Sequence, residues 1–328
     1  MKKRLVSIVI PVFNEEENVI PFYEAAKHEL SKIANRYDHE FIFTDNCSVD
    51  GTFDQLAALA EKDRCVRVVR FSRNFGYQKS IFTGYCLANG DAAIQIDCDL
   101  QDPLLIIHQF IAKWEEGYKV VYGVRKSRHE GRLMTWIRQR FYRMIDFISD
   151  DHLPHDAGDF RLVDRKVLDQ LRNLNDASPY LRGTIAALGF KQVGIPYNRI
   201  ERHRGRGKLS FGDYVSIAID GVLNHSIVPL RLATLTGCVI SVGLILYLLG
   251  LMMLKLIYHE DWPRGFATIS VLILAAISLN AFFLGIIGEY IGRIYRQVKQ
   301  RPIVIIDQTI NFEKDLQNKL EDVQKITN

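Results

Sequence analysis

Two long stretches without a charged side chain constrain the fold of this chain more than any other feature. Residues 232–254 and residues 265–288 contain no Asp, Glu, Lys or Arg, and only ten residues separate them. Each stretch is longer than the roughly 20 residues that an α-helix needs to cross a bilayer. The alternative, two core helices of a soluble protein, does not explain two such stretches so close together. The sequence therefore predicts a transmembrane hairpin over residues 231–257 and 265–291.

The basic residues around this hairpin predict its orientation. Arg231 precedes the first stretch, and the second is followed by Arg293, Arg296, Lys299 and Arg301. The connecting loop balances Lys255 and Arg264 with Glu260 and Asp261. By the positive-inside rule, both termini lie in the cytoplasm and the loop lies outside. We therefore expect a protein of the inner (plasma) membrane with two spans.

Residues 1–125 alternate between short β-branched runs and longer amphipathic stretches. The expected strands are Val6–Ile10, Glu40–Thr44, Val66–Arg70, Ala92–Ile96 and Val120–Gly123. The expected helices are Glu16–Asn35, Thr52–Lys62, Gln78–Asn89 and Leu104–Glu116. This alternation predicts an α/β fold with a mostly parallel sheet that is covered on both faces. Ligands of such sheets bind beyond the carboxyl ends of the strands.

The segment after the fourth expected strand is rich in oxygen ligands. If the chain stays extended there, Asp97, Asp99 and Gln101 share one face, because alternate side chains of a strand point the same way. Carboxylates in this arrangement suit Mg²⁺ or Mn²⁺, which share their remaining positions with water and phosphate. An ordinary acidic turn at the end of a strand is the alternative.

Composition argues against several other classes of protein. The five cysteines are scattered and show no spacing typical of zinc sites or disulfides, which favours a reducing compartment. The net charge of +4 gives no reason to expect a nucleic-acid partner. Gly205 and Gly207 lack the third glycine of a dinucleotide-binding fingerprint.

Four blocks of the sequence stand in the order and spacing of glycosyltransferase family 2. They are Val6–Glu15, Asp45-Asn-Cys-Ser-Val-Asp-Gly-Thr52, Asp97-Cys-Asp-Leu-Gln-Asp-Pro103 and Gly158-Asp-Phe-Arg-Leu-Val-Asp-Arg165. Within that family, the chain most resembles the polyprenyl-phosphate glycosyltransferases, which include dolichol-phosphate mannose synthases and bactoprenol glucosyltransferases. The segment Leu284–Tyr295 and the pair Arg301-Pro302 extend the resemblance over nearly the whole chain.

The resemblance implies a fold and an activity. We expect a GT-A (Rossmann-like) catalytic domain over residues 1–208, a juxtamembrane helix over 209–230, the hairpin, and a cytoplasmic tail over 292–328. The implied enzyme is an inverting, metal-dependent hexosyltransferase of cell-envelope glycan synthesis. It would move glucose from UDP-glucose onto polyprenyl (undecaprenyl) phosphate. Other donors, such as UDP-GlcNAc, GDP-mannose or a modified arabinose, remain open.

The resemblance assigns the nucleotide to the ends of the first two strands and to Asp97. Pro11, Asn14 and Glu15 would meet base and ribose, although Asn14 with Glu17 also fits a helix capping box. The second block departs from the usual Asp-Asp-Gly-Ser, because Asn46 follows Asp45 and Cys47 replaces the glycine. Asp45 and Asn46 remain the expected contacts to the base.

The metal and the lipid acceptor receive separate residues. Asp97, Asp99 and Gln101 match the family's site for Mg²⁺ or Mn²⁺, where the cation stabilises the diphosphate leaving group. Asp159 matches the acidic catalytic residue that the family places near the acceptor, where it would orient the acceptor phosphate or take a residual proton from it. Arg161 either pairs with Asp159 or holds a phosphate.

A basic loop contributes Arg202 and Lys208, which meet either the acceptor phosphate or anionic headgroups of the bilayer. The basic amphipathic segment 130–149 either lies in the membrane surface or packs on the domain. Together with the family resemblance, it is compatible with a homo-oligomer.

Two other functions remain to be compared. A processive polysaccharide synthase would carry a Gln-x-x-Arg-Trp motif, which this sequence lacks. A non-catalytic membrane scaffold would explain the departures at Asn46 and Cys47, but it would not explain the retained carboxylates at 97, 99 and 159.

Overall fold

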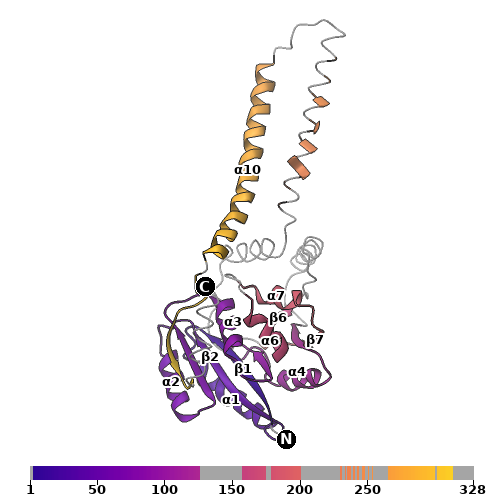
Figure 1. Cartoon of the computed structure of the whole chain (residues 1–328). Helices are drawn as coiled ribbons and strands as arrows, with labels where there is room; N and C mark the ends of the chain where they lie inside the picture. The colour runs from indigo at the N-terminus through magenta and orange to yellow at the C-terminus, as the bar shows by residue number, and fades with distance from the viewer. Residues whose placement is uncertain are drawn as a thin grey trace. The chain divides into compact units, whose positions relative to one another are not determined.

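The computed structural model describes residues 3–125, 157–174, 179–200, part of 230–253, 265–299 and 301–312. The chain divides into two compact units (Figure 1). One contains residues 1–146, 151–214 and 300–328, and the other contains residues 147–150 and 215–299. The predicted segment 130–149, the juxtamembrane segment 209–230, Arg202 and Lys208 lie outside the described residues.

The first unit is built on a single eight-stranded sheet with the strand order β7-β5-β6-β4-β1-β2-β3-β8. The strands are β1 (Arg4–Val12), β2 (Tyr37–Asp45), β3 (Val66–Phe71), β4 (Ala92–Gln95), β5 (Val120–Arg125), β6 (Ala157–Asp164), β7 (Gln192–Tyr197) and β8 (Ile306–Ile310). The helices of this unit are α1 (Val19–Ser31), α2 (Thr52–Lys62), α3 (Tyr77–Leu87), α4 (Ile106–Glu115), α6 (Arg165–Arg172) and α7 (Leu181–Ala187). All of the strands and helices expected within residues 1–125 are confirmed.

The sheet is parallel at its centre and mixed toward its edges. Strands β4, β1, β2 and β3 run parallel, as do β5 and β7. Strand β6 runs antiparallel between β4 and β5, and β8 runs antiparallel along β3. The expected mostly parallel α/β sheet is therefore confirmed, with antiparallel strands added from the second half of the chain.

Each face of the central strands packs on its own set of helices. In β1, Val6, Ile8 and Ile10 belong to the core that includes α1, α2 and α4. Val9 points to the other face, toward a core shared with α3 and α6. Such burial on both faces is typical of parallel strands. Helix α3 approaches β1 closely at Gly84, where a Cβ atom would clash with Val9.

The segment after the second uncharged stretch returns to the sheet. Ile303 and Val304 are fully buried, and Ser72 donates a backbone hydrogen bond to Ile305 at 2.9 Å. The side chain of Asn311 donates to the backbone oxygens of Ala60 (2.6 Å) and Val66 (2.8 Å). Part of the region expected as a tail therefore forms one edge of the sheet, next to β3.

Helix α10 (Phe266–Val298) covers the second uncharged stretch in the other unit. Many of its large apolar side chains are exposed: Ile269, Leu272, Ile273, Ile277, Phe282, Leu284, Ile287, Ile291, Ile294 and Val298. Counted over the described residues alone, no helix is long and apolar enough to be assigned as a membrane span. The hairpin therefore stays a prediction.

A buried ion pair joins β2 to β3. Glu40 accepts hydrogen bonds on Oε1 from the Ser7 hydroxyl (2.5 Å) and the Asn89 backbone (2.8 Å). Its Oε2 lies 2.8 Å from Nη1 of Arg67. Since Glu40 is almost fully buried, its charge depends on these partners for compensation.

We expect Glu40→Ala to lower the free energy of unfolding by about 3–5 kcal/mol, because it leaves Arg67 half-buried without its partner. Chemical denaturation of the purified protein measures this loss. Asp38→Ala is the control, since Asp38 forms only a long, solvent-exposed pair with Lys3 and should change little. Equal effects of the two substitutions would show that the Glu40 network does not stabilise the fold.

Candidate functional site

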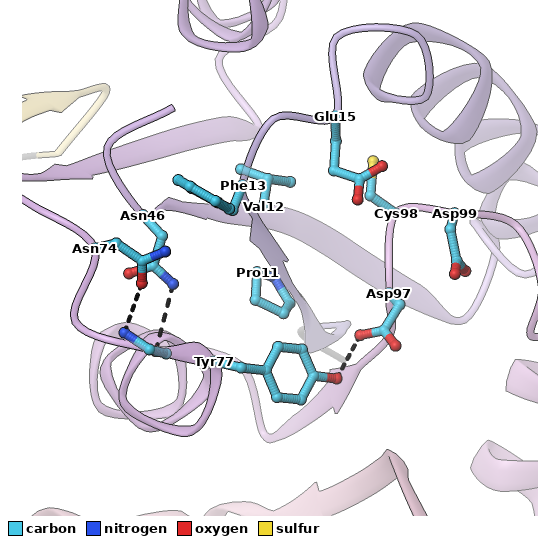
Figure 2. Close-up of a pocket in the computed structure, with 11 residues that line it drawn as sticks. Pro11, Val12, Phe13, Glu15, Asn46, Asn74, Tyr77, Asp97, Cys98 and Asp99 are labelled. Atoms are coloured by element: carbon cyan, nitrogen blue, oxygen red, sulfur yellow. Dashed lines mark hydrogen bonds between the residues drawn. The ribbon is translucent and has the colours of Figure 1, made fainter. Parts of the chain in front are cut away.

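A cavity of about 350 Å³ opens beyond the carboxyl ends of β1 and β4 (Figure 2). Its lining residues come from the end of β1, the start of α3 and the loops that follow β1, β2, β3 and β4: Pro11, Val12, Phe13, Glu15, Asn46, Asn74, Gly76, Tyr77, Asp97, Cys98 and Asp99. Parallel pairing brings these loops together, because Val12 of β1 lies opposite Asp45 of β2, and Val9 lies opposite Gln95 of β4. The cavity thus occupies the position expected for a ligand of such a sheet.

Asn14 ties the loop after β1 to the loop after β2. Its backbone N–H donates to the Ser48 hydroxyl, and its side-chain oxygen accepts from the Val49 N–H, both at 2.9 Å. Asn14 holds a left-handed φ of 55°, which asparagine tolerates better than most residues. The alternative interpretation of Asn14 and Glu17 as a helix capping box is wrong, because α1 begins only at Val19.

Glu15 extends from the same loop into the cavity wall. Its Oε2 accepts a hydrogen bond from the Asn18 side chain at 2.6 Å. Its backbone N–H donates to the hydroxyl of Thr52, at the start of α2. Figure 2 shows the Glu15 carboxylate near Cys98, across from Asn46. Among the described residues, no hydrogen-bond donor reaches the other oxygen, Oε1, so that an acceptor remains at the cavity.

Asp45 and Asn46 take different positions. Asp45 is fully buried, accepts from the backbone (3.0 Å) and hydroxyl (2.5 Å) of Ser48, and does not line the cavity. Burial raises the pKa of Asp45, although the hydrogen bonds from Ser48 and the charge of Arg70 oppose the rise. Asn46 lines the cavity, where its amide accepts from Phe75 N–H (3.2 Å) and donates to the Gly76 oxygen (3.3 Å).

The backbone conformation at Cys47 is one that favours glycine, the residue that the family pattern has at this position. Its φ is 63°, in the left-handed region that glycine adopts without steric cost. A side chain there costs roughly 1–2 kcal/mol. The chain therefore carries a side chain at a position where the backbone conformation favours glycine.

The acidic segment reaches the cavity through a turn rather than an extended strand. Strand β4 ends at Gln95, and Leu100 has a left-handed φ of 56°. The expectation that strand alternation aligns Asp97, Asp99 and Gln101 is therefore wrong. Asp97 and Asp99 still line one cavity. The backbone of Gln101 donates to Asp99 Oδ1 (3.1 Å) and accepts from Ile200 (2.9 Å).

Tyr77 and Gln95 surround Asp97. The Tyr77 hydroxyl donates to Asp97 Oδ1 at 2.5 Å (Figure 2). The Gln95 amide donates to the same oxygen at 3.0 Å. Desolvation by burial raises the pKa of Asp97 to about 7. The charges of Asp102, Asp99 and Asp159 add to this rise, whereas the Tyr77 hydrogen bond opposes it. The site therefore concentrates negative charge around Asp97.

An arginine that follows strand β7 lies close to these carboxylates. Arg199 follows β7 and lies 3.3 Å from Asp102 and 3.8 Å from Asp99. Asp102 also accepts from the Tyr197 hydroxyl at 2.6 Å. Arg199 therefore fixes the end of the acidic turn and partly compensates its carboxylates.

Asp159 forms a forked ion pair with Arg182 of α7. Its two carboxylate oxygens accept from Nε (2.9 Å) and Nη2 (2.8 Å) of Arg182. Burial by itself would raise the pKa of Asp159, but Arg182, Arg161 and a hydrogen bond from Gln78 together hold it below its usual value. Arg161 is 3% exposed and donates to the Gly158 oxygen. The accessible arginine beside Asp159 is thus Arg182.

The donor set fits a hard divalent cation. Asp97 and Asp99 present two carboxylates to one cavity, and Mg²⁺ is commonly bound by one or two carboxylates plus water and substrate phosphate. No cluster of three or more His, Cys, Asp or Glu side chains within the described residues forms a metal site by itself. The ligand set with Gln101 stays a prediction.

Sequence reasoning missed Tyr77, Gln95, Arg182 and Arg199. Tyr77 was within reach, since it follows the carboxyl end of β3 and the same rule that found the other loops applies to it. Arg182 and Arg199 lie beyond the regular alternation, where no spacing pattern marks them.

Comparisons with known proteins agree over most of the chain. The family model described as Glycosyl transferase family 2 matches residues 7–172. The uncharacterized glycosyltransferase YkcC of Bacillus subtilis (strain 168) is 37% identical over 308 residues, which are 94% of each chain. The bactoprenol glucosyl transferase of Shigella phage SfII is 34% identical over 305 residues, which cover 93% of this chain and 98% of the relative.

One of the similar solved structures is glucosyl-3-phosphoglycerate synthase from Mycobacterium tuberculosis in complex with Mn²⁺, UDP-glucose and phosphoglyceric acid. It is 21% identical, with a TM-score of 0.45, and the match covers 67% of this chain and 79% of that chain.

The raised pKa of Asp97 predicts a pH-dependent gain from Asp97→Asn in metal-free protein. Folded Asp97 holds its proton up to about pH 7, whereas an unfolded Asp releases it near ~3.9. Wild-type stability therefore falls as pH rises between these values. Thermal unfolding with chelator should show Asp97→Asn more stable than wild type at pH 8, with the difference shrinking toward pH 4. A difference independent of pH would contradict a desolvated Asp97.

The left-handed turn at Cys47 predicts opposite effects of two substitutions. Cys47→Gly should preserve or raise the unfolding temperature, whereas Cys47→Val should lower it, because a β-branched side chain is least tolerated at positive φ. Cys65→Val is the matched control, since Cys65 is exposed and outside the left-handed region. Equal unfolding temperatures for the two Cys47 variants would rule out strain at this turn.

Proposed function

Since the chain belongs to glycosyl transferase family 2, we propose that it transfers glucose from UDP-glucose onto a polyprenyl phosphate at the cytoplasmic face of the plasma membrane. The observation that carries this proposal is the convergence of Asp97 and Asp99 on one cavity at the carboxyl ends of β1 and β4. The relatives named bactoprenol glucosyl transferase support the choice of sugar and lipid.

The donor half of the site is the cavity itself. Its volume of about 350 Å³ suits part of a sugar nucleotide. Glu15 offers a carboxylate to the ribose hydroxyls, which suits it because a carboxylate accepts two hydrogen bonds. Asn46 shapes the wall where the base would lie. Asp45 holds Ser48, whose hydroxyl in turn accepts from the Asn14 N–H.

Asp97 and Asp99 would hold a divalent cation, Mg²⁺ or Mn²⁺, which when bound stabilises charge on the departing diphosphate as a Lewis acid. Tyr77 and Gln95 fix Asp97 by hydrogen bonds, and Arg199 lies beside Asp99. These contacts orient both carboxylates before the donor arrives. Without a cation, the same carboxylates would repel a diphosphate.

The acceptor phosphate needs little activation. Its second pKa lies near ~6, so that it is largely a dianion at neutral pH. One of its oxygens attacks the anomeric carbon from the face opposite UDP, and the bond from that carbon to the diphosphate oxygen breaks. UDP leaves with the electron pair, and the configuration inverts. Asp159 is ionised and already paired with Arg182, which suits orientation better than proton transfer.

The expected membrane hairpin supports a lipid as the acceptor, because it would hold the enzyme in the bilayer. Residues 232–254 and 265–288 lack charge, and the large apolar side chains of α10 are exposed. We propose that these segments cross the bilayer with both termini in the cytoplasm, as the flanking basic residues favour. The catalytic unit is then anchored in the bilayer that holds polyprenyl phosphate.

The test is transfer of labelled sugar by the protein in lipid nanodiscs with polyprenyl phosphate and Mg²⁺ or Mn²⁺. Labelled lipid should form from UDP-glucose and disappear with chelator. Asp99→Asn should cut the rate at least ~100-fold, about 2.7 kcal/mol, because one ligand of the cation loses its charge. Asp38→Asn, far from the cavity, should retain the wild-type rate.

Other donors decide between the remaining functions. Labelled lipid from UDP-GlcNAc, GDP-mannose or a modified arabinose nucleotide, and none from UDP-glucose, would replace the sugar in this proposal. Absence of product with every donor would favour a non-catalytic scaffold.

A further inference from the structure

The forked ion pair between Arg182 and Asp159 uses only one edge of the guanidinium group. Nε and Nη2 donate to the two carboxylate oxygens at 2.9 and 2.8 Å. Arginine carries five N–H donors, so that the edge formed by Nη1 and Nη2 retains donors for another ligand. Within the part of the chain that the structure describes, Asp159 is the only ion-pair partner of Arg182.

The Arg182 side chain is partly exposed, whereas the carboxylate of Asp159 is nearly buried. The Arg182 side chain is 39% exposed, and that of Asp159 is 10% exposed. An arginine whose role was only to neutralise a buried Asp would gain nothing from this exposure. The arrangement instead orients the guanidinium group through two hydrogen bonds, and in the described residues Nη1 takes no part in the pair with Asp159.

The local charge favours an anion at that edge. Arg161 lies 4.0 Å from Asp159 on the buried side, so that two arginines surround one carboxylate. The three side chains together carry a net charge of +1, and Arg182 is the member that reaches the surface. A phosphate group matches the fork geometry of arginine and can accept two parallel hydrogen bonds.

Gln78 links the pair of Asp159 and Arg182 to the donor half of the site. Its side chain hydrogen-bonds Asp159, and its amide oxygen accepts from the backbone N–H of Leu181 at 3.3 Å. The preceding residue, Tyr77, holds Asp97 in the cavity. The first turn of α3 thus contacts both the carboxylate of the donor cavity and the partner of Arg182.

We propose that the outer edge of Arg182 binds the phosphate monoester of the acceptor, and that Asp159 is the positioning residue that holds Arg182 in place. This inference rests on the proposed function, because it names the acceptor group of the same site. It assigns Asp159 no proton transfer. The donor nucleotide binds independently of the pair.

Steady-state kinetics in lipid nanodiscs test the assignment. Arg182→Gln should raise the KM for polyprenyl phosphate at least ~10-fold, which is about 1.4 kcal/mol, and change the KM for the donor less than about twofold. Arg182→Lys keeps the charge but not the fork and should fall between Gln and wild type. Arg36→Gln is the matched control, because it removes another arginine paired with a carboxylate, Glu115, far from the cavity.

Asp159→Asn distinguishes positioning from general-base catalysis. If Asp159 only holds Arg182, its substitution should raise the acceptor KM, leave the acidic limb of the pH–rate profile in place, and add little in the Asp159→Asn/Arg182→Gln double variant. Loss of the acidic limb with an unchanged acceptor KM would overturn the assignment of Asp159.

A binding experiment separates this inference from the proposed function. A short-chain prenyl phosphate should raise the unfolding temperature of the wild-type protein in detergent, the matching prenyl alcohol should not, and inorganic phosphate reports how much of the effect needs the lipid chain. Arg182→Gln should lose the phosphate-dependent rise and keep the rise caused by UDP-glucose. Active wild-type enzyme with unchanged acceptor KM and binding in both Arg182 variants overturns the inference alone. Inactive wild type with every donor overturns the proposed function and the inference with it.

Discussion

The parallel pairing of β1 with both β2 and β4 is the constraint on which the rest of the site depends. Val12 lies opposite Asp45, and Val9 lies opposite Gln95, so that the carboxyl ends of all three strands lie side by side. Their side chains are buried on both faces, and a one-residue slip would exchange those faces. The hydrophobic core therefore fixes where Asp97 and Asp99 emerge. The strand register sets where each loop begins, and the loop conformations then set how its side chains point into the cavity.

Several carboxylates lie close together at the carboxyl ends of these strands and repel one another. Arginines from the second half of the chain partly compensate this negative charge. Asp97 lies among Asp99, Asp102 and Asp159, and its pKa is raised to about 7 by burial and by these neighbours. Arg199, which follows β7, forms ion pairs with Asp99 and Asp102, and Arg182 of α7 forms one with Asp159. Among the described residues, the hydrogen-bond donors to Asp97 are neutral, namely Tyr77 and Gln95. The compensation is thus incomplete at Asp97, which is where a cation would bind.

Much of the first half of this fold follows from sequence alone, because strand–helix alternation and buried runs are local signals. The bounds of α2 match the expected Thr52–Lys62. The second half was missed because its elements depend on distant partners: β6 is antiparallel between two earlier strands, and β8 pairs with β3 from far along the chain. Motif spacing found Asp97, Asp99 and Asp159. It did not find Arg182, since an ion pair between distant segments leaves no periodic trace.

The division of the site into two halves follows from the first turn of α3. Tyr77 holds Asp97, and its neighbour Gln78 contacts Asp159 and the start of α7. Consecutive side chains near a helix start point in different directions, so that one short segment supports both halves without merging them. Gly84 lets α3 lie close against β1, which ties this segment to the same strand that sets the edge of the sheet. A shift of α3 would therefore alter the contacts of Asp97 and of Asp159 together.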